Sequence, residues 1–402
     1  MRSLRRLLLP DGLLLAGGLA VARVDALREA AGDAAMTLVV AAVVIGALLS
    51  LRFHRGRVLL ILLLVGLVHA ILIAPLPSPT DRAAFALTAV LAPVAVGVLA
   101  LLPERGALST AGLVRFGALV IAAMGAAAFA SWSPEQVVAV LERPLAPARV
   151  FGWTPLPQPA VAAGIAALLL FLILWVREPS PIARGLFWSQ LAVLLGLHAW
   201  SPAPGPEPSI WIATAALVLV LTVVESSYAL AYHDPLTGLP GRRALGEALG
   251  NVGGGDRYTV AMVDVDHFKR CNDRWGHDVG DHVLRMVASR LAHVTGGGRA
   301  FRYGGEEFAV LFSGLSAADA RPHAEELRRT VESSPFAVRH RPRPRQRPAA
   351  GKVRRTKVEP ISVTISVGLA EGDGRAKPEA VIAAADQALY RAKESGRNRV
   401  EG

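Results

Sequence analysis

Cysteine and charge are the two things that this sequence has little of. It contains one cysteine, Cys271, among 402 residues, which excludes an internal disulfide and a cysteine-rich zinc site. Up to about residue 230 the chain is rich in Leu, Ala and Val and poor in charge, whereas the remainder resembles a soluble domain in composition. We therefore expect a transmembrane sensory domain at 1–228 and a soluble domain at 229–402, with Cys271 reduced in the cytoplasm.

The N-terminal half divides into apolar runs close to the length that crosses about 30 Å of hydrocarbon. We expect about eight membrane helices. The first run is weak because Pro10 and Asp11 interrupt it, and a signal peptide is its alternative interpretation. The runs cover about residues 7–23, 35–51, 58–76, 83–102, 111–131, 159–176, 183–200 and 209–228.

Arginines mark alternate connections between these runs, which the positive-inside rule places in the cytoplasm. With eight spans, both ends of the chain are then cytoplasmic. His69 and His198 are the only candidates for a functional ionisable residue well inside a run, and charged pathway residues are lacking, so a transporter is disfavoured. The marking residues are Arg2, Arg5, Arg6, Arg52, Arg55, Arg57, Arg105, Arg115, Arg177 and Arg184.

Two further absences concern the connections of the soluble domain. No Gly/Ser-rich linker follows the last run, so 225–234 is expected to be a stiff connection that carries movement into the soluble domain, a passive tether being the alternative.

The insertion 339–357 has nine Lys and Arg and no acid, and it accounts for most of the formal net charge of +11. It is either simply solvated or held against anionic lipid, nucleic acid being a weaker alternative, and no specific nucleic-acid binding is expected.

The soluble domain centres on the stretch RAFRYGGEEFAVLF at 299–312. Two strand-like runs flank Gly304 and Gly305, and the glycines predict a tight turn because only Gly adopts a positive φ without strain. Glu306 and Glu307 follow as adjacent carboxylates. A divalent metal site and a solvated acidic turn both fit this stretch on its own.

A second carboxylate pair follows the strand expected at 258–265. Asp264 and Asp266 flank the end of this strand, where a buried carboxylate is unfavourable unless it is paired or binds metal. Lys269 and the helix start after Asp266 could both meet a phosphate. The order of elements is βαββαβ with additions, which predicts an α+β ferredoxin-like or palm fold with helices on one face of a mostly antiparallel sheet.

Together these motifs resemble the GGDEF domain of diguanylate cyclases, in its GGEEF variant. The resemblance covers residues 234–400 and implies synthesis of cyclic di-GMP from two GTP, with release of pyrophosphate, in a homodimer at the bacterial inner membrane. The motifs are DPLTGLP at 234, DVDHFKRCND at 264, GHDVGD at 276, RYGGEEF at 302, ISVGLA at 365 and ADQALYRAKESGRNRV at 385.

The resemblance also implies roles for single residues. Asp264, Glu306 and the Val265 carbonyl are expected to bind Mg²⁺ or Mn²⁺. Glu307 is expected to bind metal or to activate the ribose 3′-hydroxyl, with Lys269 also counted as catalytic. The residues expected to bind GTP are Asn272 and Asp281 at the guanine, Phe268, Lys269, Lys393 and Arg397 at the phosphates, and Gly304 and Gly305 by backbone approach. Lys393 and Arg397 are four residues apart, which predicts one shared helix face.

Two departures from the family pattern are visible. The entry motif has Gly241 where the family usually has Asn, which is expected to loosen a local cap without affecting catalysis. The inhibitory RxxD is replaced by Thr295-Gly-Gly-Gly298, so product feedback through that site is not expected. The main hypothesis is a membrane-bound diguanylate cyclase controlled by its membrane domain, and the alternative is a catalytically silent receptor for GTP or cyclic di-GMP.

Overall fold

The computed structural model describes residues 8–74, 78–147, 152–200, 206–252, 256–334, 336–337, 360–373 and 375–402. The chain forms two compact units, Met1–Tyr228 and Ala229–Gly402. The basic insertion at 339–357 lies outside the described residues.

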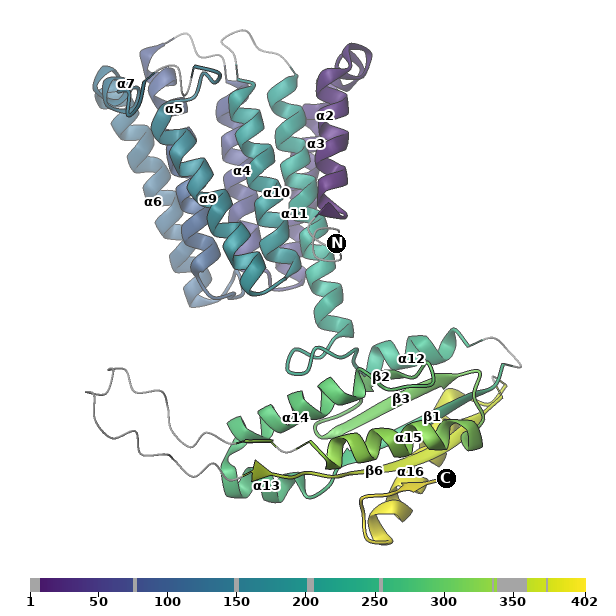
Figure 1. The fold of residues 1–402 in the computed structure, drawn as a ribbon. Coiled ribbons are helices and arrows are strands. Elements are labelled where there is room, and N and C mark those ends of the chain that lie inside the picture. The colour runs from purple at the N-terminus through teal and green to yellow at the C-terminus, as the bar shows by residue number, and fades with distance from the viewer. Residues whose placement is uncertain are drawn as a thin grey trace, which may run out of the picture. The chain divides into compact units, whose positions relative to one another are not determined.

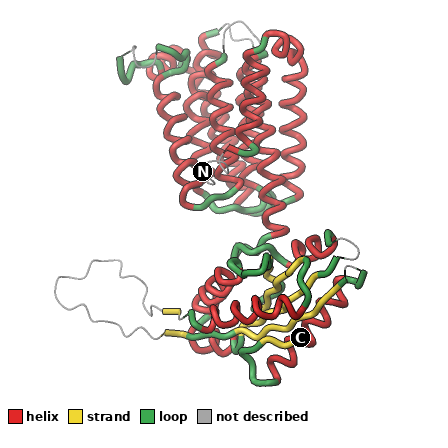
Figure 2. The backbone as a smooth tube through the Cα atoms, turned by 45° about the vertical axis from the view of Figure 1, so that its right-hand side comes forward, coloured by secondary structure: helices red, strands yellow, loops and turns green. Residues whose placement is uncertain are grey.

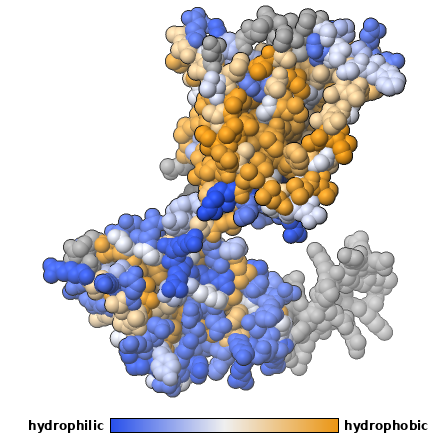
Figure 3. Space-filling model, turned by 180° about the vertical axis from the view of Figure 1, so that it is seen from behind, coloured by the Kyte–Doolittle hydropathy of each residue, from blue (hydrophilic) through white to orange (hydrophobic). Residues whose placement is uncertain are grey.

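The first unit is a bundle of helices whose visible surface is mostly apolar, while polar residues dominate the second unit (Figure 3). Its helices are labelled in Figure 1. They are α2 (Asp11–Arg23), α3 (Asp25–Arg52), α4 (Gly56–Ile73), α5 (Pro79–Leu101), α6 (Thr110–Trp132), α7 (Pro134–Leu141), α9 (Gln158–Arg177), α10 (Pro181–His198) and α11 (Glu207–Tyr232).

Six of these helices are long and apolar enough to cross a membrane, namely α4, α5, α6, α9, α11 and, beyond a kink at Gly32, the part of α3 from Ala34. The two other expected spans form helices that fall short. α2 has 13 residues, and α10 contains Arg184, Gln190 and His198, which lower its hydropathy. Length and composition therefore support six of the eight expected spans.

Charged side chains meet inside this unit, which was not expected from the sequence. Arg184 Nε lies 2.6 Å from Oδ2 of the fully buried Asp11, and Arg184 also pairs with Glu225 on α11. Arg55 Nη2 donates to the Ser226 carbonyl at 2.8 Å. These contacts fasten the region of α11 around Glu225 to α2, to α10 and to the connection between α3 and α4.

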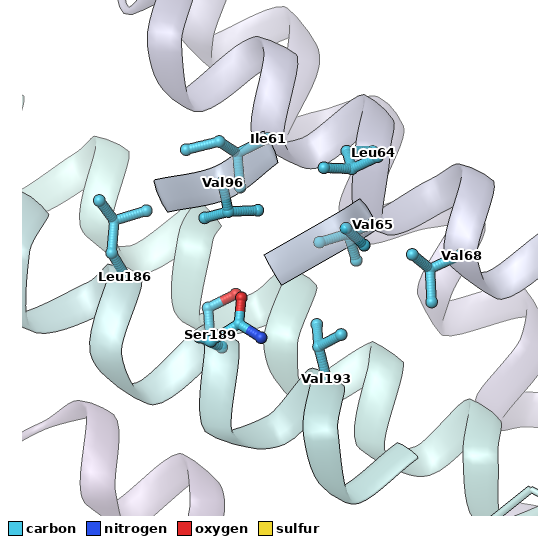
Figure 4. Close-up of a pocket in the computed structure, with 10 residues that line it drawn as sticks. Ile61, Leu64, Val65, Val68, Val96, Leu186, Ser189 and Val193 are labelled. Carbon is cyan, nitrogen blue, oxygen red and sulfur yellow. The ribbon is translucent and has the colours of Figure 1, made fainter. Parts of the chain in front are cut away.

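A small cavity lies between α4, α5 and α10 (Figure 4). Its lining is apolar apart from Ser189 and Gln190, each only 3% exposed. Its volume of about 10 Å³ suits one water molecule. The cavity therefore offers no room for a larger ligand in this conformation.

The second unit contains a five-stranded sheet in the order β2-β3-β1-β6-β7. Figure 2 draws its strands in yellow. β6 and β7 pair in parallel, and the other neighbours are antiparallel. The expected strand at 361–370 is divided between β5, which pairs with β4, and β6. The strands are β1 (Tyr258–Val265), β2 (Arg299–Arg302), β3 (Glu307–Ser313), β4 (Phe336–Ala337), β5 (Pro360–Ile361), β6 (Ile365–Gly372) and β7 (Val400–Glu401).

Helices cover both faces of this sheet, so the prediction of helices on one face was wrong. Val263 and Val265 of β1 belong to the core under α14 and α15, whereas Val260 and Met262 belong to the core under α12 and α16. All eight residues of β1 are buried, as expected for a strand without polar alternation. The helices are α12 (Arg242–Gly250), α13 (Phe268–Trp275), α14 (His277–Leu291), α15 (Ala317–Glu332) and α16 (Pro378–Glu394).

Candidate functional site

Strand register brings two of the predicted acids together. Asp264 of β1 is paired with Glu307 of β3, and directly opposed residues of antiparallel strands point to the same face with Cβ atoms about 5 Å apart. Lys393 of α16 reaches the same point, with its Nζ 2.9 Å from Asp264 Oδ2. Residues up to 129 positions apart in the sequence therefore converge at the end of β1.

The surroundings of Asp264 and Glu306 oppose the ionisation of both carboxyl groups. Burial raises the pKa of Asp264, which is 6% exposed, although Lys393 acts in the opposite direction. Burial and then the charge of Asp264 raise the pKa of Glu306. The Val265 N–H donates to the Glu306 carbonyl at 3.4 Å, which ties the hairpin to the end of β1. A cation between these groups would relieve the repulsion.

The residues present fit Mg²⁺ or Mn²⁺ only if the substrate shares in the coordination. Among the described residues no group of three or more His, Cys, Asp or Glu side chains is arranged to hold a metal. Mg²⁺ typically takes one or two carboxylates and completes its shell with substrate phosphates and water. Asp264, Glu306 and the Val265 carbonyl are oxygen donors of this kind.

The hairpin glycines serve a different purpose from the one predicted. Neither Gly304 nor Gly305, both within the described hairpin, has a positive φ. A Cβ at Gly304 would instead lie 2.7 Å from Glu307 Oε2, while one at Gly305 would meet open space. A side chain at position 304 would therefore displace the carboxylate of the catalytic candidate Glu307, and the prediction that both glycines have a positive φ was wrong.

Arg302, which the sequence analysis did not single out, holds this hairpin. Its Nη2 donates to the Gly305 carbonyl at 2.6 Å and its Nε to the Gly304 carbonyl at 3.1 Å. Its Nη1 lies 2.6 Å from Asp234 Oδ1, which also accepts from the backbone and hydroxyl of Thr237. Burial alone would raise the pKa of Asp234, but the Thr237 and Arg302 hydrogen bonds hold it below its ordinary value. The sequence signal that could have predicted this ion pair is the opposite charge of Arg302 and Asp234, each of which stands in a turn-forming motif.

The candidates for guanine recognition lie together on α13 and α14. Asn272 Oδ1 is buried and has no hydrogen-bond partner among the described residues. A Cβ on Gly280 would lie 1.9 Å from that oxygen, so Asn272 packs directly beside the residue that precedes Asp281. Phe268 is 7% exposed, and Lys269 is exposed on the first turn of α13.

Arg397 does not share a helix face with Lys393, contrary to prediction. α16 ends at Glu394, and Arg397 follows in a turn with φ 64°, in which its N–H donates to the Ala392 carbonyl at 3.0 Å. Burial dominates the raised pKa of Asp264, and Arg397 acts against it together with Lys393. Arg397 is thus near the acids, but a turn places it there.

Other contacts occupy the loop where the family's inhibitory motif is missing. Thr295 Oγ1 lies 2.8 Å from His323 Nδ1 and donates to Glu326 Oε2 at 2.8 Å. This loop is therefore fastened to α15. At Gly241, the other departure, α12 begins without a side-chain cap, as expected.

A family model described as "Diguanylate cyclase, GGDEF domain" matches residues 231–399. These residues form a GGDEF domain. The chain is similar to the response regulator PleD of Caulobacter vibrioides, at 40% identity over 186 residues that make up 44% of this chain and 37% of PleD. It is also similar to the diguanylate cyclase DgcP of Pseudomonas aeruginosa, at 40% identity over 185 residues, 44% of this chain and 25% of DgcP.

Among solved structures, the coiled coil and GGDEF domain of DgcB from Caulobacter crescentus, in complex with c-di-GMP, is 34% identical. The match covers 44% of this chain and 88% of that chain, with a TM-score of 0.38. This chain thus spans well under half the length of the curated relatives PleD and DgcP.

Proposed function

We propose that this protein is a membrane-bound diguanylate cyclase that condenses two GTP molecules into cyclic di-GMP with release of two pyrophosphates. The observation that carries the proposal is the convergence of Asp264, Glu307 and Lys393 at one end of the GGDEF domain's sheet. Carboxylates that can share a divalent cation, next to a phosphate-binding cation, are what phosphoryl transfer requires.

The reaction assigns a role to each of these groups. Asp264, Glu306 and the Val265 carbonyl hold Mg²⁺ or Mn²⁺, and Glu307 is a further ligand or the acid beside the attacking hydroxyl. The bound ion supplies neutralisation of phosphate charge. Glu307 or solvent takes the proton of the ribose 3′-hydroxyl, whose oxygen then attacks the α-phosphorus of the second GTP. The bond from that phosphorus to the pyrophosphate breaks as the new ester forms, and Lys269 stabilises the phosphate charge.

Recognition of GTP rests on two groups of residues. Asn272 and Asp281 meet the guanine edge, and the orphaned Asn272 Oδ1 supports this because a buried acceptor without a partner is unfavourable unless a ligand pairs with it. Phe268, Lys269, Lys393 and Arg397 surround the phosphates, and Gly304 and Gly305 admit the nucleotide to the backbone.

The membrane domain regulates this activity in our proposal. Two GTP-loaded GGDEF domains must meet for two condensations to occur, so a homodimer is required. The protein is multi-pass in the bacterial inner membrane with its GGDEF domain in the cytoplasm. Product feedback through the loop at 295–298 is absent.

The test uses the full-length protein in lipid nanodiscs with GTP and Mg²⁺, and mass spectrometry of the products. Wild-type protein is expected to form cyclic di-GMP, and Glu307→Gln is expected to form none. Glu379→Gln is the matched control, because Glu379 borders the same cleft as Glu307 without belonging to the proposed machinery. GTP binding without product, across several lipid compositions, would support a silent receptor and overturn the proposal.

A further inference from the structure

Asp266 is a buried carboxylate to which the proposed reaction assigns no role. It follows β1 directly and is 6% exposed. Its Oδ1 accepts from Ser366 Oγ at 2.7 Å, and its Oδ2 accepts from Thr364 Oγ1 at 2.7 Å and from the backbone N–H of Asn398 at 3.1 Å. Three donors therefore converge on Asp266, and one of them belongs to the turn after α16.

That turn has a backbone conformation that is unfavourable for Arg397. Arg397 and Asn398 have φ values of 64° and 48°, in the left-handed region that side chains other than those of Gly, Asn and Asp seldom adopt. An arginine in this conformation persists only when surrounding contacts fix it. The Asp266 contact to the next N–H along the chain is such a contact.

A second set of contacts holds the same turn from α15. Arg328 Nη1 donates to Asn398 Oδ1 at 2.6 Å, and Asn398 Nδ2 donates to Glu332 Oε1 at 2.7 Å. Arg328 is itself 9% exposed and bonded to Glu325 and Glu332. The backbone N–H of Asn398 is thus bound by Asp266, directly after β1, and its side chain is bound by Arg328 and Glu332 of α15.

From these contacts we propose that Asp266 is a positioning residue for Arg397. By holding the Asn398 N–H, Asp266 fixes the left-handed turn that directs the Arg397 guanidinium toward the nucleotide phosphates beside Asp264 and Lys393. The inference rests on the proposed function, because it takes Arg397 to be a phosphate-binding residue. It makes the second acid of the Asp264-Val-Asp266 motif a support of the phosphate site.

The chemistry of the three partners explains why this position needs a carboxylate. The Thr364 and Ser366 hydroxyls can donate or accept, whereas the Asn398 N–H can only donate. A carboxylate accepts from all three groups, and its charge strengthens these hydrogen bonds. Asp266→Asn keeps the size of the side chain but removes that charge, and it therefore weakens the contact with the turn.

The experiment measures binding of 3′-deoxy-GTP with Mg²⁺ to the full-length protein in nanodiscs. This nucleotide lacks the attacking hydroxyl, so binding is read without turnover. Arg397→Ala is expected to weaken binding about ten- to a hundredfold, the usual effect of losing hydrogen bonds to a charged group. Asp266→Asn is expected to weaken it about tenfold, and the double variant to match Arg397→Ala within about twofold, because both changes remove one interaction.

Ser366→Ala is the matched control. Ser366 donates to the same carboxylate but does not contact the turn, so its loss is expected to lower the melting temperature and to leave nucleotide affinity unchanged. Asn398→Ala loosens the turn without altering β1, and it is expected to reproduce the Asp266→Asn pattern even if Asp266→Asn fails to fold.

The outcomes separate this inference from the proposed function. Multiplicative losses in the double variant, or equal loss of affinity in Ser366→Ala and Asp266→Asn, would overturn the positioning role and leave the proposed function standing. Wild-type binding without cyclic di-GMP formation would overturn the proposed function, while the affinity cycle would still decide the role of Asp266. Absence of 3′-deoxy-GTP binding by the wild type would overturn both.

Discussion

Replacing Arg302 with alanine should disable the hairpin around Gly304 and Gly305, although Arg302 itself is not among the residues proposed to contact GTP. The side chain is 13% exposed and that of its partner Asp234 is 19% exposed, so the ion pair is largely shielded from solvent. Truncation removes the Asp234 contact and both bonds to the carbonyls of Gly304 and Gly305. The backbone N–H of Arg302 still donates to Pro240, so the strand itself remains attached.

The size of the effect follows from these contacts. Hydrogen bonds to a charged group contribute about 1.5–3 kcal/mol each, and they are not additive when one side chain makes all of them. Breaking a shielded pair by removing one partner costs about 3–5 kcal/mol, and partial exposure places Arg302 at the lower end, about 3 kcal/mol. In a domain of this size that lowers the melting temperature by about 6–12 °C.

Two measurements on Arg302→Ala test this reasoning, a thermal melt of the full-length protein and its rate of cyclic di-GMP formation. The rate is expected to fall at least about tenfold because Glu306 and Glu307 lose their fixed position. The melting temperature and the rate of Arg302→Lys should lie between those of wild type and Arg302→Ala, since an ammonium cannot meet three acceptors as a planar guanidinium does. Arg299→Ala is the control on the same strand, because Arg299 is exposed and stacks on Phe301. Wild-type stability and rate in Arg302→Ala would refute the reasoning.

The remaining predictions concern the site acids, inhibition by the product and the buried ion pair of the membrane unit. The raised pKa of Glu306 means that the stability contributed by its protonated carboxyl is present at low pH and is lost as pH rises. At about pH 8, with a chelator present, Glu306→Gln should therefore have a higher melting temperature than wild type. The rate of the same variant with Mg²⁺ should fall about a hundredfold. The Mg²⁺ concentration that gives half-maximal rate should be higher at about pH 6 than at about pH 8. Asp264 and Glu306 must lose their protons to bind metal, and the pKa of each is raised. Added cyclic di-GMP should not lower the rate non-competitively, given the replaced loop at 295–298. Arg184→Met should destabilise the membrane unit more than Asp11→Asn does, as it leaves a buried acid unpaired, and the double change should recover part of the loss in a detergent melt.

Motifs and periodicity were sufficient to predict the family and the order of strands and helices, because each rests on local pattern. The apolar strand 258–265, the amphipathic helix before residue 294 and the glycine hairpin all form where expected. The prediction of helices on one face followed from the order of the elements and was wrong. β1 carries the signal for two covered faces, because a strand without polar alternation is buried on both sides.

The departures within the site have the same physical origin, since they depend on contacts between distant segments. Spacing alone placed Lys393 and Arg397 on one helix, but the helix ends at Glu394 and the turn behind it depends on Asp266, 131 residues earlier than Arg397. In the membrane unit, Asp11 weakened the first expected span in the sequence, yet Asp11 is buried in the structure, where it pairs with Arg184.

The most direct test of the central claim is the stoichiometry of the reaction of GTP with the full-length protein in nanodiscs. Cyclic di-GMP and pyrophosphate are quantified together, with Glu307→Gln in parallel. The account predicts two pyrophosphates for each cyclic di-GMP from the wild type and neither product from the variant. Pyrophosphate or phosphate release without cyclic di-GMP, or equal product from the variant, would contradict it.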